Sequence, residues 1–158
     1  MFKGLSKNKY IKKRSMNKEN KKRFYQMFNS KIIEFLNDLI KIFPGDTEFK
    51  MYKNAVNLIK MADEKKPLQL YNTFVTEEYK QNIEERNEAF FLEHDYNEIL
   101  NSDIVKNSDF VQKELDGNVN NKIVNKLKGY WNDLTDENKE FIWSYFTLFL
   151  KISNKVYS

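Results

Sequence analysis

The sequence lacks cysteine and has only two prolines, four glycines and one histidine among its 158 residues. Without cysteine, the chain has no disulfide, no thiolate metal ligand and no cysteine nucleophile. So few glycines and prolines leave little turn chemistry for β-hairpins and no glycine-rich phosphate-binding loop. No apolar run approaches the ~18 residues that cross a membrane, and the N-terminus has no apolar signal-peptide core. We therefore expect an intracellular protein that is not secreted and has no transmembrane segment.

The most apolar segment lies near the C-terminus and predicts the central element of the fold. Thr135 or Asp136 can cap a helix start, and the acids that follow suit the positive end of the helix dipole. Large apolar side chains then point nearly all round a helix, at Trp143, Tyr145, Phe146, Phe149 and Leu150. A helix that is apolar on every side is one that other helices surround. We therefore predict an all-α fold, a single compact bundle of about five to seven helices around a central hydrophobic C-terminal helix.

A long helix is predicted to begin at Lys18. Apolar residues recur every three or four positions over residues 24–43, and the proline–glycine pair at 44–45 then ends the helix. A second helix is expected to start near Asp46 or Thr47. Such a short connection between two long amphipathic helices favours an antiparallel pair.

The middle of the chain predicts shorter helices. Pro67 suits the first turn of a third helix, where its missing N–H costs nothing. That helix either continues through Tyr79 or ends earlier, in which case Thr76 caps a separate short helix. A last amphipathic helix is predicted before the central one, with its apolar stripe at Val119, Ile123, Leu127, Tyr130 and Trp131.

Positive charge is concentrated at the N-terminus, although the net charge of the whole chain is only +4. The first 23 residues contain a single acid, Glu19, and ten cations: Lys3, Lys7, Lys9, Lys12, Lys13, Arg14, Lys18, Lys21, Lys22 and Arg23. Residues 1–15 also lack a helical apolar period. We therefore predict a basic flexible arm over residues 1–16 and an all-helical domain over residues 17–158.

The basic arm has several possible roles. The ten cations of residues 1–23 could release counterions from nucleic-acid phosphates, or bind an anionic membrane or protein surface. They could equally be solvated chain without a partner. Tyr10, Phe24 and Tyr25 could stack on bases, although Phe24 begins the apolar stripe of the first helix.

His94 lies among acids and is the one candidate for a metal ligand. On a helix it would share a face with Glu98 and could hold a metal ion. A catalytic zinc or iron site needs two or three nitrogen ligands, so a turn between helices, with Asp95 as the next cap, is the favoured interpretation. Carboxylates elsewhere, such as Glu84 and Glu140, lie at helix starts or on charged faces, where solvation is the expected role. We expect no catalytic residue, no metal and no cofactor, and hence no enzyme.

The sequence around each of the two tryptophans predicts a different environment. Trp143 lies in the most apolar segment, and we expect it in the core. Trp131 lies beside Tyr130 near a helix end and is the better candidate for an exposed aromatic side chain. Because tryptophan is enriched at binding hot spots, Tyr130 and Trp131 are the candidate protein interface.

Five segments, in the same order, resemble a family of small, functionally uncharacterised proteins of large double-stranded DNA viruses of algae and protists. They are NSKIIEFLNDLIKIFP at 29–44, KKPL at 65–68, FFLEHDY at 90–96, KLKGYW at 126–131, and LTDENKE at 134–140 followed by Ile142 and Trp143. The similarity covers residues 24–155 and leaves out the basic arm. It implies a viral source and expression in the cytoplasm of an infected cell, with packaging into virions as one alternative. It brings no catalytic motif and no established activity.

Three functions from different classes remain open. The first is a non-enzymatic interaction or structural protein that works through helix surfaces and the basic arm. The second is a nucleic-acid-associated accessory factor whose arm contacts phosphates, and the third is a small metal-dependent enzyme around His94. The sequence favours the first, and it names neither a partner nor an oligomeric state.

Overall fold

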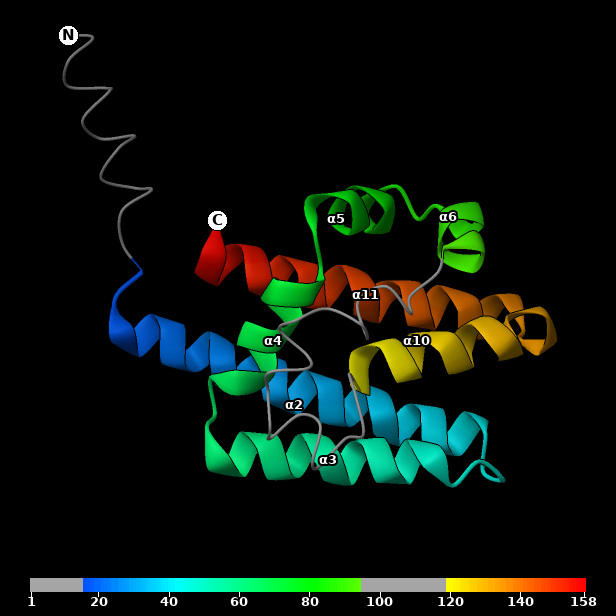
Figure 1. Cartoon of the computed structure of the whole chain (residues 1–158), viewed down its shortest axis with the longest axis horizontal. Helices are drawn as coiled ribbons and strands as arrows, with labels where there is room; N and C mark the ends of the chain where they lie inside the picture. The colour runs from blue at the N-terminus through cyan, green and yellow to red at the C-terminus, as the bar shows by residue number, and fades with distance from the viewer. Residues whose placement is uncertain (1–15, 95–118) are drawn as a thin grey trace, which may run out of the picture.

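In the computed structural model, the described residues, 16–94 and 119–158, fold into seven α-helices and one 3-10 turn, with no strand among them (Figure 1). In chain order the elements are α2 (Lys18–Ile42), α3 (Glu48–Ala62), α4 (Lys66–Phe74), α5 (Glu77–Glu84), α6 (Glu88–Glu93), α10 (Val119–Tyr130), η1 (Trp131–Asp133) and α11 (Asp136–Tyr157). The all-α prediction is therefore confirmed. Among these residues, no helix combines the length and the apolar content that a membrane crossing requires.

Helices α2 and α3 form the predicted antiparallel pair (Figure 1). The side chain of Asn17 caps α2 by accepting a hydrogen bond from the backbone N–H of Asn20 at 2.9 Å. The helix ends at Ile42, where Pro44 follows and excludes another helical turn. One face of each helix is buried between them, and the short turn at 43–47 reverses the chain.

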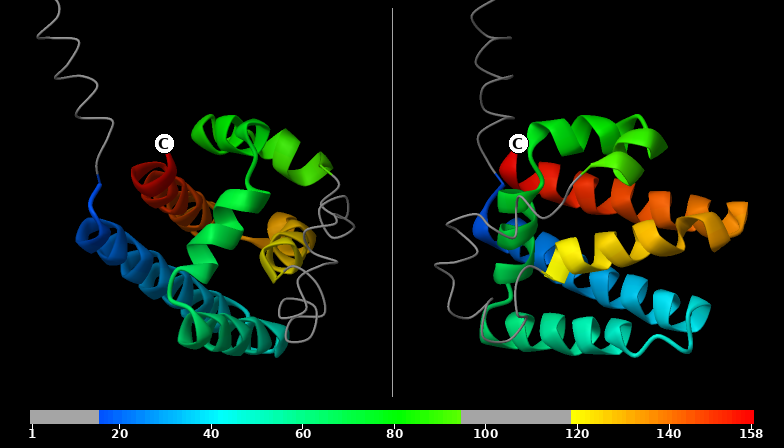
Figure 2. Two further views of the ribbon diagram at one scale, coloured as in Figure 1. Left: turned by 60° about the vertical axis from the view of Figure 1, so that its left-hand side comes forward. Right: turned by 45° about the vertical axis from the view of Figure 1, so that its right-hand side comes forward.

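Helix α11 lies between the α2–α3 pair and the α5–α6 segment (Figures 1 and 2). Thr135 caps it, because its side-chain oxygen accepts a hydrogen bond from the backbone N–H of Asn138 at 3.1 Å. The ring of Phe149 lies 5.4 Å from that of Phe28 and 5.7 Å from that of Phe35. The central position of this helix is confirmed. A narrow exposed stripe nevertheless runs along it, at Glu137, Glu140, Ser144, Lys151 and Lys155.

The structure between α4 and α6 shows whether the third predicted helix continues through Tyr79 or ends earlier, which the sequence left open. Pro67 lies in the first turn of α4, as predicted, and the helix ends at Phe74. Val75 and Thr76 are extended, so α5 is a separate short helix that starts after Thr76. Helix α5 has no fully buried residue. Helices α4 and α5 therefore form two separate segments of the bundle.

Trp131 is fully buried, with an exposed fraction of 0%, so the expectation that it is an exposed aromatic is wrong. The four-residue step from Ile123 to Leu127 puts both on the inner face of α10, and Trp131, the first residue of η1, lies four residues further on and continues that row. The ring of Trp131 packs at 5.0 Å from Phe91 and at 5.9 Å from Trp143. The prediction that Trp143 belongs to the core is confirmed.

Candidate functional site

The outer face of α3 exposes large apolar side chains. The exposed fractions are 63% for Met51, 48% for Leu58 and 79% for Met61. These positions are seven and three residues apart, so they form one row along the helix, away from the buried face that holds Phe49 and Val56. We call this row the α3 stripe. Single exposed apolar residues are normal on protein surfaces, whereas a row on one helix is typical of a contact surface.

Lysines border the α3 stripe on one side. Lys50 is exposed, and Lys53 and Lys60 are partly exposed, on the adjoining sector of the same helix. Within the described ranges, no ion pair joins these three ammonium groups to a carboxylate. The face therefore combines flexible apolar side chains with positive charge that no described carboxylate neutralises through an ion pair.

A second surface forms where α2 begins and α11 ends, at the same end of the molecule (Figure 1). The hydroxyl groups of Tyr25 and Tyr157 interact there, and burial together with this contact raises the pKa of Tyr157. Six cations lie on these two helix ends, namely Lys18, Lys21, Lys22, Arg23, Lys151 and Lys155. We call this surface the basic end.

The sequence predicted only part of the basic end. Four of its cations belong to the predicted set, whereas Lys151 and Lys155 were missed because they lie more than a hundred residues away in the chain. The other predicted cations, Lys3, Lys7, Lys9, Lys12, Lys13 and Arg14, lie outside the described residues. Tyr25 is buried, so it belongs to the core and not to a base-stacking surface.

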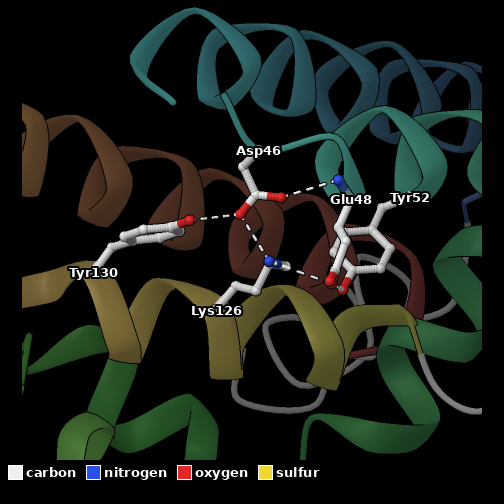
Figure 3. Close-up of polar contacts among 5 residues, drawn as sticks. All are labelled: Asp46, Glu48, Tyr52, Lys126 and Tyr130. Atoms are coloured by element: carbon white, nitrogen blue, oxygen red, sulfur yellow. Dashed lines mark hydrogen bonds and ion pairs between the residues drawn. The ribbon is translucent and has the colours of Figure 1, made fainter. Parts of the chain in front are cut away.

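A polar network connects the α2–α3 turn to α10 (Figure 3). One oxygen of Asp46 accepts hydrogen bonds from the ammonium group of Lys126 at 2.7 Å and from the hydroxyl of Tyr130 at 2.6 Å. Its other oxygen accepts from the backbone N–H of Glu48 at 2.9 Å. Lys126 also pairs with Glu48 at 3.3 Å, and Tyr52 donates to the same Glu48 oxygen at 2.8 Å.

The geometry of this network favours a structural role. Burial raises the pKa of the Asp46 carboxyl, but the hydrogen bonds from Lys126 and Tyr130 outweigh this effect and hold the pKa below its ordinary value. Both oxygens of this largely buried carboxylate already have donors. The network therefore fixes α10 against the start of α3, and we assign no chemistry to it.

Tyr130 has a role in this network that its sequence position did not reveal. Its ring stacks on Phe43 with centroids 4.2 Å apart and an angle of 18° between the planes, and its hydroxyl binds Asp46. The side chain is half-buried and takes part in contacts within the chain. With Trp131 in the core, the structure does not bring the two residues together on an exposed surface.

His94 follows the last residue of α6. Its Nε2 atom lies 2.6 Å from the hydroxyl of Tyr79, and its ring stacks on Phe90 with centroids 4.9 Å apart. Asp95 and Glu98, the acids predicted beside it, lie outside the described residues. In the part of the chain that the structure describes, no cluster of three or more histidine and acidic side chains could hold a metal ion.

The exposed carboxylates include one defined ion pair. Arg86 donates to both oxygens of Glu140, at 2.5 and 2.6 Å, and this contact lowers the pKa of Glu140. The pair connects the end of α5 to the first turns of α11. Because both side chains are exposed, this contact stabilises the fold only modestly.

Comparisons with protein-family models, with curated proteins and with solved structures gave no significant match. The resemblance to the viral family therefore stays a prediction from the sequence. Among the described residues, the α3 stripe and the basic end are the two candidate functional surfaces.

Proposed function

We propose that this protein is a non-enzymatic interaction protein that binds a partner protein through the outer face of α3. The single observation that supports this proposal is the α3 stripe, whose three side chains are between 48% and 79% exposed. Methionine is unbranched and polarizable, so a surface that contains two methionines can adapt its shape to a partner.

The charge beside the stripe indicates the chemistry of the partner. Lys50, Lys53 and Lys60 lie along one edge of the apolar row, so an amphipathic helix with an acidic edge would match both features. Apolar contact along such a helix provides affinity, and complementary charge sets orientation and the rate of association. We therefore propose an acidic amphipathic helix as the segment that binds α3.

Affinity purification with matched variants tests the proposal. The test variant changes Met51, Leu58 and Met61 to serine, which removes the apolar row while leaving the buried face of α3 unchanged. The control changes Met27 to serine, because Met27 is also exposed, at 44%, but lies on α2. We expect a partner that the parent and the control retain and the test variant loses.

Direct binding of that partner to purified protein then measures the effect. We expect at least tenfold weaker binding by the test variant, because a tenfold loss needs only about 1.4 kcal/mol and each buried CH₂ group that is removed costs about 0.8 kcal/mol. Equal affinity for the parent and the test variant would contradict the proposal. So would a partner whose binding depends on Met27.

A second candidate function follows from the basic end. Six exposed or partly exposed cations lie on the two helix ends that meet there, and a concentration of positive charge is typical of surfaces that bind nucleic-acid phosphates. We propose nucleic-acid association as the alternative function, in which the predicted basic arm, which precedes α2 in the sequence, also takes part. Its test is the dependence of DNA affinity on salt concentration.

A further inference from the structure

Helix α5 is weakly packed on the rest of the bundle. It lies on the outside of the molecule beside α11 (Figures 1 and 2), and none of its eight residues is fully buried. An isolated helix of this length is unstable in water, so α5 depends on its contacts with the other helices. Beneath it, Tyr79, Asn82 and Ile83 form part of the wall of an apolar cavity of about 120 Å³, which leaves this side of α5 incompletely packed.

The backbone on both sides of α5 departs from helical geometry. Val75 and Thr76 are extended before the helix begins. After it ends, Arg86 has a φ of 50°, in the left-handed region that residues other than glycine rarely adopt. Beyond this second break, Phe91 fixes α6 to the core, because its ring packs at 5.0 Å from that of Trp131. These two breaks would allow α5 to move while α4 and α6 stay in place.

A polar contact holds each end of α5. Near its start, the hydroxyl of Tyr79 lies 2.6 Å from Nε2 of His94. Just after its end, Arg86 donates to both oxygens of Glu140 on α11. Both side chains of this ion pair are exposed, so water and salt weaken it.

We propose that α5 is a lid over the cavity, which opens about the breaks at 75–76 and 85–87 while the rest of the bundle stays folded. The ion pair between Arg86 and Glu140 holds the lid closed. Opening removes one wall of the cavity and uncovers apolar side chains such as Phe74 and Phe146. Segments with few buried contacts are the ones that open locally in folded proteins. This inference is independent of the α3 stripe, which lies outside the wall of the cavity.

Amide hydrogen exchange of the full chain, followed by NMR, tests whether α5 opens by itself. We compare the amides of Ile83 and Glu84 in α5 with those of Phe149 and Leu150 in α11. Protection in α5 should be at least about 100-fold lower, because α5 exchanges through local opening and the buried centre of α11 only through global unfolding. Equal protection in the two helices would overturn the proposal.

A variant that destabilises the whole fold separates local from global opening. Asp46→Asn weakens the contact of Lys126 and Tyr130 with the α2–α3 turn, and this contact stays intact when only α5 opens. It should lower the protection of the α11 amides at least about fivefold and leave that of the α5 amides within about twofold of the parent. A parallel loss in both helices would show that α5 opens only when the whole molecule unfolds, and the proposal would be wrong.

Two variants of α11 test the role of the ion pair. Glu140→Gln removes the charge that binds Arg86, so the protection of α5 should fall about two- to fivefold, as expected for an exposed ion pair. Glu137→Gln is the matched control, because Glu137 is exposed on the same helix and forms no ion pair with a described residue. Unchanged protection of α5 in Glu140→Gln, or an equal fall in both variants, would overturn the role of the pair. The measurements on the parent protein remain decisive about the lid even if a variant fails to fold.

Discussion

At the scale of single residues, Trp143 tests the core most sharply. It packs against Trp131 and Phe91, and little of its surface is exposed. Trp143→Ala should reduce the free energy of unfolding by about 3–5 kcal/mol, through lost burial and the cavity that remains. Chemical denaturation followed by circular dichroism measures this change.

The matched control for that variant lies on the same helix. Ser144 is exposed, so Ser144→Ala should change the free energy of unfolding by less than about 0.5 kcal/mol. A Trp143→Ala protein that melts within a degree or two of the parent would show that α11 is not the centre of the core.

The aromatic residues also show how far single positions could be predicted. Trp143 was placed correctly because its whole neighbourhood in sequence is apolar. Trp131 was misplaced because its position near a helix end was given more weight than its four-residue step from Leu127. The role of Tyr130 depends on Asp46, which lies 84 residues away, and no local pattern predicts such a contact.

At the scale of secondary-structure elements, the contact between Asp46 and α10 predicts a dependence of stability on pH. Asp46→Asn should reduce the free energy of unfolding at pH 7 by about 1–3 kcal/mol, because Lys126 and Tyr130 lose a charged acceptor. The pKa of this carboxyl is lower in the folded protein than the value near 3.9 expected in the unfolded chain. Its contribution is therefore complete above that value and is lost as the pH falls through the lower folded pKa.

Denaturation as a function of pH, with a control, checks this prediction. The difference between the parent and Asp46→Asn should shrink as the pH falls below about 4. Asp133 is exposed, and Asp133→Asn should have little effect on stability at any pH. If the two variants behave alike at pH 7, the network does not hold α10 to the α2–α3 turn.

The sequence predicted the long elements better than the short ones. The start of α2 and the antiparallel α2–α3 pair follow from long apolar periods and a proline–glycine stop. The break at 75–76 could be predicted only as an alternative, because tertiary packing decides whether a short helix continues or ends. The α3 stripe could not be predicted for a related reason. The sequence alone does not show whether another helix covers an apolar side chain that lies outside the buried face of its own helix.

At the scale of the whole molecule, the basic end predicts the effect of salt on DNA binding. If it contacts DNA, the logarithm of affinity should fall with the logarithm of salt concentration, with a slope near −0.9 for each phosphate neutralised. Deletion of residues 1–15 removes six cations and no acid, which changes the net charge from +4 to about −2. The truncated protein keeps the six cations of the basic end, so it should lose the part of the slope that the arm contributes and retain the rest.

The melting temperature provides the control for that deletion. It should change little, because the described core is formed by residues from Tyr25 onward. Equal DNA affinity of the parent and of the protein that lacks residues 1–15 would show that the arm does not contact DNA. No binding by either protein at low salt would contradict nucleic-acid association altogether.

The central claim, that α3 binds a partner protein, is tested most directly by photo-cross-linking in the cells that produce the protein. A photoreactive benzoylphenylalanine at Leu58 would lie in the α3 stripe, and the same group at Met27 would lie on an exposed position of α2. We predict a defined cross-linked product from position 58, containing one partner protein with an acidic amphipathic helix, and none from position 27. Absence of a product from position 58, or the same products from both positions, would contradict the claim.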